Sequence, residues 1–389
     1  MNKSMMVGTL VLLPVAALAD VTLYGTLQGG MGRNTISNGA NSNAMNDNTS
    51  FIGIKGMESM GNGLKALWQV ENRVHLDGNN ALDTFGSRET FVGLDGDRQG
   101  KIRIGYLNSS LNDLYTVDQW QYLNNINQSN TGDPSKNNGA NGLSILTNPG
   151  NRLKNTIRYD TAEFEGFKAS LAYGFGENKS NTQGINYASD IFSLGFNYHF
   201  GPYFANYAFQ REANPLGLTA ATPATTPQSY SAGAQSGSNA QSANIHYAEF
   251  GYKDDQLLLA LGYQVAIGYD WTDAFSGDSK GNFGSSAAPR SAAQARVKTR
   301  QAALSAAYHT GPWVPKISYA KGWDQSTNGA HRSNSGYQQY ILGVDYHLSK
   351  RTRTGLSYGR LNFDQNALAA VNQHKTTLTS TALTLRHSF

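Results

Sequence analysis

The sequence predicts an all-β fold, a sixteen-stranded antiparallel transmembrane β-barrel, and three observations lead to it. Short segments alternate between apolar and polar or small residues along the whole chain, and the connections between them alternate between short and long. No segment beyond the N-terminus reaches the roughly 18 consecutive apolar residues that a membrane helix needs. In lipid only helices and closed barrels satisfy every backbone hydrogen bond, and a barrel shows its apolar surface only at every second residue.

The N-terminus has the pattern of a secretory signal. Lys3 supplies a positive charge, residues 5–18 are apolar but too short to span a bilayer, and Ala17 and Ala19 are small residues at the two cleavage-defining positions. We therefore predict a signal peptide at residues 1–19, cleaved after Ala19. Residues 20–389 are then a single barrel domain in an exported protein.

Composition narrows the chemistry of this chain. There are no cysteines, so a disulfide framework, thiolate metal sites and thiol catalysis are excluded. The formal net charge of +4 is mild, with no basic run of the kind that binds nucleic acid. The eight histidines show no metal-ligand spacing. We expect no cofactor, no metal site and no nucleic-acid partner.

Period-two alternation is the main evidence for strands. In residues 257–271 one parity is apolar and ends in aromatic residues, while the other is mostly small or polar. Residues 192–200 and 64–75 repeat the pattern. Aromatic rings at strand ends are typical of the interfacial girdles of membrane barrels.

The connections give the strand count. Seven short turns are expected near residues 59–62, 96–100, 163–166, 201–202, 253–256, 311–312 and 349–351. Eight long polar connections are expected near residues 34–49, 77–86, 108–151, 177–188, 214–243, 272–296, 324–336 and 364–375. Fifteen connections predict sixteen strands, with the short turns on the periplasmic side and the long loops outside. The final Phe389 fits a closing strand whose last ring lies at the periplasmic interface.

Several motifs, in order along residues 20–389, carry a family resemblance. They are DVTLYG (20–25), FIGIKG (51–56), GNGLKALWQVE (61–71), RETFVGL (88–94), GYLNS (105–109), IRYD (157–160) with Glu163-Phe164, and LRHSF (385–389). Together they resemble the trimeric general porins of β-proteobacteria, of the neisserial and Bordetella/Burkholderia type. The resemblance implies a sixteen-stranded barrel, a homotrimer, and a third external loop, residues 108–151, folded into the pore.

An apolar outside sends the opposite parity of each strand into the barrel, because Lys or Arg facing mid-bilayer lipid costs roughly 2–4 kcal/mol. Lys101 and Arg103, for example, alternate with Ile102 and Ile104, and Leu153 is expected outside. The basic residues predicted to line the pore are Lys55, Lys65, Arg73, Lys101, Arg103, Arg152, Lys154 and Arg158. The acidic residues predicted on the same face are Glu71, Glu89 and Asp160.

Loop 108–151 carries Asp113, Asp118 and Asp133. If the loop folds inward, as the resemblance implies, these acids face the basic wall, and we expect a mild preference for anions. Tyr106 stands where the family often has Arg, which removes one basic group near the loop base. The alternative is that the basic residues are solvated and paired with the neighbouring acids, with no direct part in selectivity.

A second set of cations carries the outward parity near the predicted external strand ends. It consists of Arg88, Lys298, Arg300 and Arg360. Such residues either contact lipid headgroups or lipopolysaccharide, or form a solvated rim.

The predicted function is a water-filled channel for passive diffusion of small hydrophilic solutes and ions across the outer membrane of a Gram-negative bacterium. Outer-membrane lipid and lipopolysaccharide are its expected partners. A solute-specific channel, for phosphate or an organic anion, is an alternative and would show saturable conductance. A barrel enzyme would need a Ser/His or Asp/His constellation, which the sequence does not mark. A barrel with a closed lumen would give no single-channel steps.

Overall fold

The structure is a computed structural model that describes residues 20–37, 41–47, 50–76, 85–118, 120, 152–176, 180–182, 185–187, 190–213, 242–268, 297–367 and 375–389. The predicted signal peptide, residues 1–19, lies outside this part of the chain. The long strands are β1 (Asp20–Ile36), β3 (Phe51–Gly61), β4 (Leu64–Arg73), β5 (Thr90–Gly96), β6 (Gly100–Asn108), β7 (Arg152–Asp160), β8 (Phe167–Gly174), β11 (Ile191–Phe200), β12 (Tyr203–Glu212), β13 (Ala243–Lys253), β14 (Leu257–Ile267), β15 (Val297–Tyr308), β16 (Trp313–Gly322), β19 (Tyr337–His347), β20 (Thr352–Phe363) and β21 (Thr376–Ser388).

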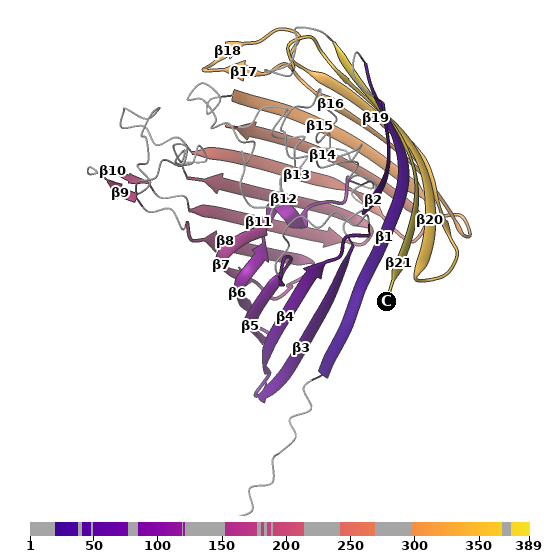
Figure 1. The fold of residues 1–389 in the computed structure, drawn as a ribbon. Helices are drawn as coiled ribbons and strands as arrows, with labels where there is room; N and C mark the ends of the chain where they lie inside the picture. Colours follow the sequence, from indigo (N-terminus) through magenta and orange to yellow (C-terminus); the bar gives the residue numbers. More distant parts are fainter. Residues whose placement is uncertain are drawn as a thin grey trace, which may run out of the picture.

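These sixteen strands form one closed antiparallel barrel, which confirms the predicted fold and strand number. Each strand pairs with the next long strand along the chain, so the topology is a simple meander. Strand β1 closes the ring, because residues 20–26 pair with β3 and residues 26–36 pair with β21. Figure 1 shows β1 and β21 side by side, although one begins and the other ends the described chain.

Seven short connections lie at one end of the barrel, at residues 62–63, 97–99, 161–166, 201–202, 254–256, 309–312 and 348–351. All seven match the predicted turns. One of the two two-residue turns, Asn62-Gly63, has both residues at positive φ, 51° and 78°. Two consecutive left-handed residues are what a type I′ hairpin turn needs, and Asn-Gly is the sequence that supplies them.

Three segments predicted as plain loops contain short strands instead. β2 (Ser42–Asp47) pairs with β1, β9 (Ser180–Thr182) pairs with β10 (Ile185–Tyr187), and β17 (Ser326–Thr327) pairs with β18 (Ala330–His331). The β17–β18 hairpin turns on Asn328 and Gly329, again both at positive φ. The Asn-Gly pair is a typical hairpin sequence, but the sequence-based strand count did not use it to predict these two short strands.

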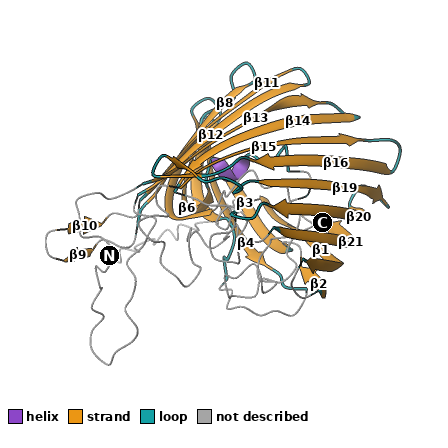
Figure 2. Cartoon of the chain, turned by 90° about the horizontal axis from the view of Figure 1, so that it is seen from above, coloured by secondary structure: helices purple, strands orange, loops and turns teal. Residues whose placement is uncertain are grey.

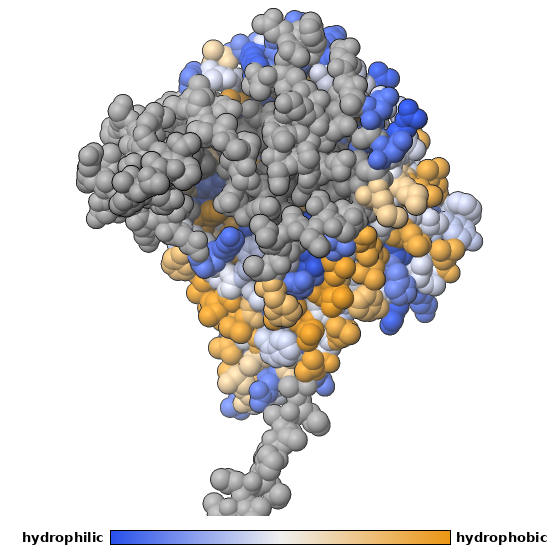
Figure 3. All heavy atoms as spheres, in the orientation of Figure 1, coloured by the Kyte–Doolittle hydropathy of each residue, from blue (hydrophilic) through white to orange (hydrophobic). Residues whose placement is uncertain are grey.

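The outer surface of the strands is an apolar belt. Large exposed side chains cover it, among them Leu23, Ile54, Val92, Ile104, Leu171, Leu259, Leu304, Ile317, Leu342, Leu356 and Leu383. In Figure 3 the apolar belt lies along the barrel between more hydrophilic margins. Among the described residues, no helix is long and apolar enough to cross a membrane.

The inner surface is polar or small, with buried Gln28, Ser193, Gln264, Gln301 and Gln339 at alternating positions. A short 3-10 helix, η1 (Leu111–Asp113), follows β6 and lies inside the ring of strands, where it contacts β6, β11 and β12. Figure 2, a view turned by 90°, also places this helix within the curve of the sheet. The third loop therefore begins inside the barrel.

Candidate functional site

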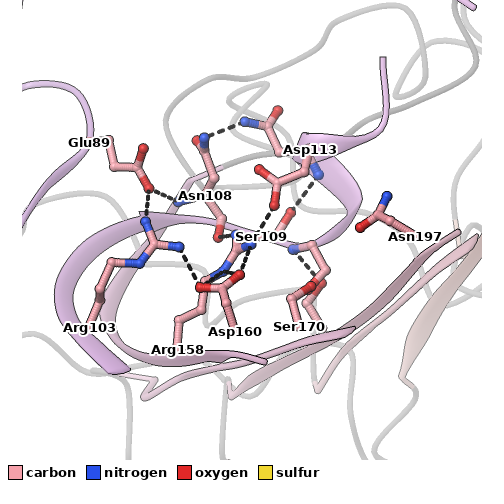
Figure 4. A network of polar contacts seen from close by, with 12 residues as sticks. Glu89, Arg103, Asn108, Ser109, Asp113, Arg158, Asp160, Ser170 and Asn197 are labelled. Atoms are coloured by element: carbon pink, nitrogen blue, oxygen red, sulfur yellow. Dashed lines mark hydrogen bonds and ion pairs between the residues drawn. The ribbon is translucent and has the colours of Figure 1, made fainter. Parts of the chain in front are cut away.

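The inner wall of β6 and β7 holds a network of ion pairs (Figure 4). Arg103 of β6 donates from Nη1 to Glu89 Oε1 at 3.2 Å and from Nη2 to Asp160 Oδ2 at 2.7 Å. Arg158 of β7 lies on the other side of Asp160 and is 2.6 Å from its Oδ1. The strands hold these guanidinium groups inside because their apolar neighbours, such as Ile104, are exposed on the outer face.

The same network holds the beginning of the third loop. Arg158 Nη2 is 2.5 Å from Asp113 Oδ2 of η1, and Arg158 Nη1 donates to the carbonyl oxygen of Asn108 at 2.8 Å. Arg158 is 5% exposed. Charge-assisted bonds of this kind are about twice as strong as neutral ones. The loop acid therefore touches the basic wall directly, with no open gap between the two charges.

Hydrogen bonds on both sides of η1 hold the loop as it crosses toward the opposite wall. Just before η1, the N–H of Ser110 donates to Ser193 Oγ of β11 at 3.0 Å. The next contacts follow η1. The N–H groups of Thr116 and Val117 donate to Oε2 and Oε1 of Glu249 on β13, both at 3.1 Å. Glu249 is 1% exposed and also accepts from the hydroxyl of Tyr247 at 2.7 Å. One buried carboxylate thus satisfies two consecutive loop amides.

The far end of this segment is held by Trp120. Its indole Nε1 donates to Ser318 Oγ of β16 at 2.6 Å, and the ring is 1% exposed. Ser305 of β15 donates to the carbonyl oxygen of Val117 at 2.5 Å. The ammonium of Lys316 lies 4.6 Å from the centroid of the Trp120 ring, a cation–π contact. The described part of the loop is therefore fixed at both walls.

Two strand glycines make room for the loop. A Cβ on Gly195 of β11 would lie 2.9 Å from Cβ of Ser110, and one on Gly262 of β14 would lie 3.1 Å from Cγ2 of Val117. Glycine in a strand interior often marks such a close approach. The approach of the loop to these two glycines cannot be read from the sequence without the register of the strands.

A second group of cations lies beside β4. Arg88 Nε is 3.5 Å from Glu71 Oε2, and its guanidinium stacks over the ring of Phe51. Burial and the nearby charges of Arg152 and Arg73 lower the pKa of Arg88 to about 10, while Glu71 opposes the shift. Arg88 therefore stays charged at neutral pH, in a site with a positive local potential.

The assignment of Arg88 to the outer face is wrong. Strand alternation does not apply to it, since β5 begins only at Thr90, and its side chain turns toward Glu71. Glu71 itself accepts a hydrogen bond from the hydroxyl of Tyr24 at 2.9 Å, and the ammonium of Lys55 lies over the Tyr24 ring at 4.9 Å.

Two of the predicted lysines lie close to a short turn at the opposite end of the wall. Lys65 is 3.2 Å from Asp97, and Lys101 is 3.7 Å from Asp95. All four side chains are at least about one-third exposed. Solvent screening makes exposed pairs of this kind weak. Because they lie beside a short turn and are exposed, these two lysines belong to the rim of the barrel and not to its narrow part.

The alternation breaks in β7, and one prediction there is wrong. Leu153, expected on the outer face, is 1% exposed and pairs with Leu107 of β6. Asn155 has a left-handed φ of 48°, and the register with β6 shifts between Gly105 and Leu107. This bulge inserts a residue and reverses the parity before it. The parity that predicted Lys154 and Arg152 on the inner face therefore does not hold before the bulge. Lys154 is exposed, and the position of Arg152 follows from its charge acting on Arg88 and not from alternation.

The three loop acids do not act as a set. Asp113 contacts the basic wall, as described. Asp118 accepts from the N–H of Trp120 at 3.0 Å, and its charge acts on Lys316 of β16, on the opposite wall. The expectation that Asp118 faces the early strands is therefore wrong, because the loop has already crossed the barrel at this residue. Asp133 lies outside the described residues.

Sequence reasoning missed the charged residues of the late strands. Asp345 of β19 lies 3.1 Å from Lys316 and 3.3 Å from Arg353 of β20. Their signal was present, because Lys316 alternates with apolar Ile317 in the same way as the residues of the early strands. Within the described part of the chain, no group of three or more His, Cys, Asp or Glu side chains could hold a metal ion.

Comparison with known proteins agrees with this architecture. The family described as Gram-negative porin matches residues 7–366. A major outer membrane protein P.IB of Neisseria meningitidis serogroup B is 30% identical over 399 residues, with all of both chains covered. The P.IB protein of Neisseria gonorrhoeae is 32% identical over 403 residues, also with full coverage of both.

Solved structures give the same fold. An anion-selective porin from Comamonas acidovorans aligns with a TM-score of 0.65 at 19% identity, covering 95% of this chain and all of that one. Salmonella typhi OmpF aligns with a TM-score of 0.59 at 16% identity, covering 95% and 97%. The chain belongs to the Gram-negative porin family, and it is a channel-forming barrel of the outer membrane.

Proposed function

We propose that this porin is a general diffusion channel for small hydrophilic solutes and ions, narrowed by the third loop and mildly selective for anions. The loop residues up to Trp120 bond to inward-facing side chains of β7, β11, β13 and β16, which supports a constriction inside the barrel. A water-filled lumen explains why the rest of the inner wall is polar.

The arginines beside Glu71 carry the selectivity proposal. Arg73 and Arg152 are near enough to Arg88 for their charges to lower its pKa, so three guanidinium groups share one region of the wall. Rings and clusters of like charge set the sign of selectivity in wide pores. The arginines of the neighbouring network contribute less, because Glu89, Asp113 and Asp160 already bind Arg103 and Arg158.

The measurement that tests this is the reversal potential of single channels in a planar bilayer under a salt gradient. We expect anion preference for the wild type and a clear loss of it in Arg73→Gln/Arg88→Gln/Arg152→Gln. The matched control, Arg98→Gln/Lys350→Gln/Arg351→Gln, removes three positive charges from short turns and should keep the wild-type value. Cation preference in the wild type would rule the proposal out.

We further propose that the barrel acts as a homotrimer, contacts lipid and lipopolysaccharide on its outside, and has no enzymatic activity or cofactor. The family supports trimeric assembly and solute passage. Turnover of phospholipid or peptide by the purified protein would contradict the absence of enzymatic activity. A saturable conductance, blocked by one solute at low concentration, would favour a solute-specific channel instead.

A further inference from the structure

Four basic side chains face outward near the end of the barrel opposite the short turns. They are Lys298 and Arg300 of β15, Lys321 of β16 and Arg360 of β20, and all four are exposed. We call them the cationic band. Sequence reasoning named three of them, and the structure adds Lys321 in the place of Arg88, which faces inward.

The band lies above the apolar belt and among aromatic rings. Farther toward the short turns, the same faces of these strands carry exposed Leu304, Ile317 and Leu356. Next to the band, Tyr263 and Trp323 make an edge contact at 6.1 Å, and Tyr319 and Tyr340 lie 5.0 Å apart. Aromatic girdles mark the membrane–water interface, so the cationic band lies at headgroup level.

The register makes the four cations one surface. Trp323 donates from its N–H to the carbonyl oxygen of Arg300, which places β16 beside β15 at this level. Lys321 is paired with Gln338 of β19, and the next outward residue of β19, Tyr340, is paired with Arg360. Neighbouring strands are only about 4.8 Å apart. The cations of β15, β16 and β20 are therefore within reach of one large polyanionic headgroup.

Within the described strands, no acidic residue lies on the same outer face as the cationic band. The outward positions of strands β13 to β16, β19 and β20, all of them described, carry no Asp or Glu. Asp324, which follows Trp323, is occupied by the N–H groups of Asn334 and Ser335 and by His331. Unbalanced cations next to lipid are costly unless an anionic group meets them.

We propose that the cationic band binds the phosphate groups of lipopolysaccharide in the outer leaflet. The inference rests on the lipopolysaccharide contact included in the proposed function and names the surface that makes it. Phosphate fits this surface because Arg binds it with two parallel hydrogen bonds and Lys binds it as a point charge. The long loops lie at this end of the barrel, which is the external end in an outer-membrane barrel.

The test uses the full-length barrel, refolded in detergent without lipopolysaccharide, and titrates it with three lipids. The variant Lys298→Gln/Arg300→Gln/Lys321→Gln/Arg360→Gln removes the band. The control Lys168→Gln/Lys253→Gln/Lys350→Gln/Arg351→Gln removes as many exposed cations from the end with the short turns. The probes are lipopolysaccharide, its dephosphorylated form, and phosphatidylglycerol.

We expect the wild type and the control to bind lipopolysaccharide alike, and the band variant to bind about tenfold or more weakly. The wild type should also prefer lipopolysaccharide over its dephosphorylated form and over phosphatidylglycerol. Equal binding by the band variant would overturn the proposal, and so would equal binding of phosphatidylglycerol. The band variant should keep wild-type single-channel conductance, so a loss of the lipid site is distinguishable from a failure of the channel function.

Discussion

The two walls that hold the third loop do so by different physical means. The early wall, β6 and β7, binds the loop base through the ion pair of Arg158 with Asp113, while Asp160 of the same wall pairs with Arg158. On the late wall, the buried carboxylate of Glu249 and the hydroxyl of Ser305 bind the loop backbone, and the hydroxyl of Ser318 accepts from the indole of Trp120. Ion pairs depend on the charge of both partners, whereas backbone amides are present in every loop sequence.

This difference implies that the ion selectivity of the channel and the position of the third loop depend on different sets of residues. The ion pairs of the early wall fix the loop base and at the same time neutralise two arginines that would otherwise attract anions. Glu249 and Ser318 position the loop without placing net positive charge in the lumen. We infer that the early wall sets both charge and position, while the late wall sets the position of the loop alone.

The largest effect should come from removing the cation that the loop base depends on. Arg158→Leu leaves Asp113 and Asp160 with fewer cationic partners in a buried site. Breaking a buried pair in this way typically lowers the free energy of unfolding by about 3–5 kcal/mol. Urea unfolding of the folded barrel in detergent, followed by tryptophan fluorescence, measures the change. We also expect noisier single-channel currents, because the loop base is no longer held.

Lys168→Gln is the control, since Lys168 lies on the neighbouring strand β8 and is exposed. It should change stability by less than about 0.5 kcal/mol. An Arg158→Leu barrel as stable and as quiet as the wild type would show that the ion pairs do not hold the loop.

The next effect concerns the late wall. Glu249→Gln keeps the shape of the side chain but replaces one accepting oxygen with a donating amide, which faces a backbone N–H of the loop. Losing a hydrogen bond to a charged group costs about 1.5–3 kcal/mol. We expect a barrel with wild-type reversal potential but increased current fluctuation. Glu163→Gln in an exposed turn should change neither property.

A reversal potential that moved as far in Glu249→Gln as in the triple arginine variant would contradict the separation of the two walls. The conductance of Glu249→Gln should also respond less to salt than that of Arg158→Leu, since the Asp113 carboxylate that loses its Arg158 partner is about one-third exposed and is screened by ions.

The sequence predicted the strands and turns of the barrel in detail, but it predicted only some of the contacts between the third loop and the inner wall. Alternation and turn residues are local properties, so the strand number and all seven short turns could be read directly. The partners of the loop are not local: Val117 meets Glu249 from 132 positions away. Nothing in the sequence near Val117 indicates which strand it will reach. The loop contacts therefore required the register of the closed barrel.

The errors have one common cause, which is that parity holds only inside a regular strand. Arg88 precedes β5, and the bulge at Asn155 reverses the alternation at Leu153. A left-handed residue in the middle of a strand pattern is hard to predict when it is Asn and not Gly, because Asn also occurs in regular strands. Both errors lie where the chain returns from a long connection to the barrel wall, just before β5 and at the start of β7.

A smaller effect should come from filling the space that a glycine leaves for the loop. In Gly195→Ala the new Cβ would lie 2.7 Å from Oγ of Ser170 on β8 and 2.9 Å from Cβ of Ser110 in the loop, so the loop or the strands have to move. Overpacking of this kind costs about 1–3 kcal/mol. The second variant, Gly195→Ala/Ser110→Gly, removes the opposing loop atom but leaves Ser170 Oγ in place, so it should recover part of the stability in a double-mutant cycle. Additive losses would show that the two residues do not meet.

The smallest effect tests a turn far from both walls. Asp254 accepts hydrogen bonds from the hydroxyl of Tyr252 and from the N–H groups of Leu257 and Gln256, and these bonds lower its pKa. Because the pKa is lower in the folded state, the stabilisation is complete above the ordinary value of about 3.9 and is lost as the pH falls through the folded value.

Asp254→Asn should therefore lower the unfolding midpoint slightly at pH 6, and the difference from the wild type should shrink as the pH falls through the lowered pKa of Asp254. Ion selectivity and current noise should stay unchanged at both pH values, since the turn touches neither the loop nor the arginines of the inner wall. A change in selectivity in this variant would mean that the short-turn end of the barrel also shapes the constriction. The assignment of selectivity to the early wall alone would then fail.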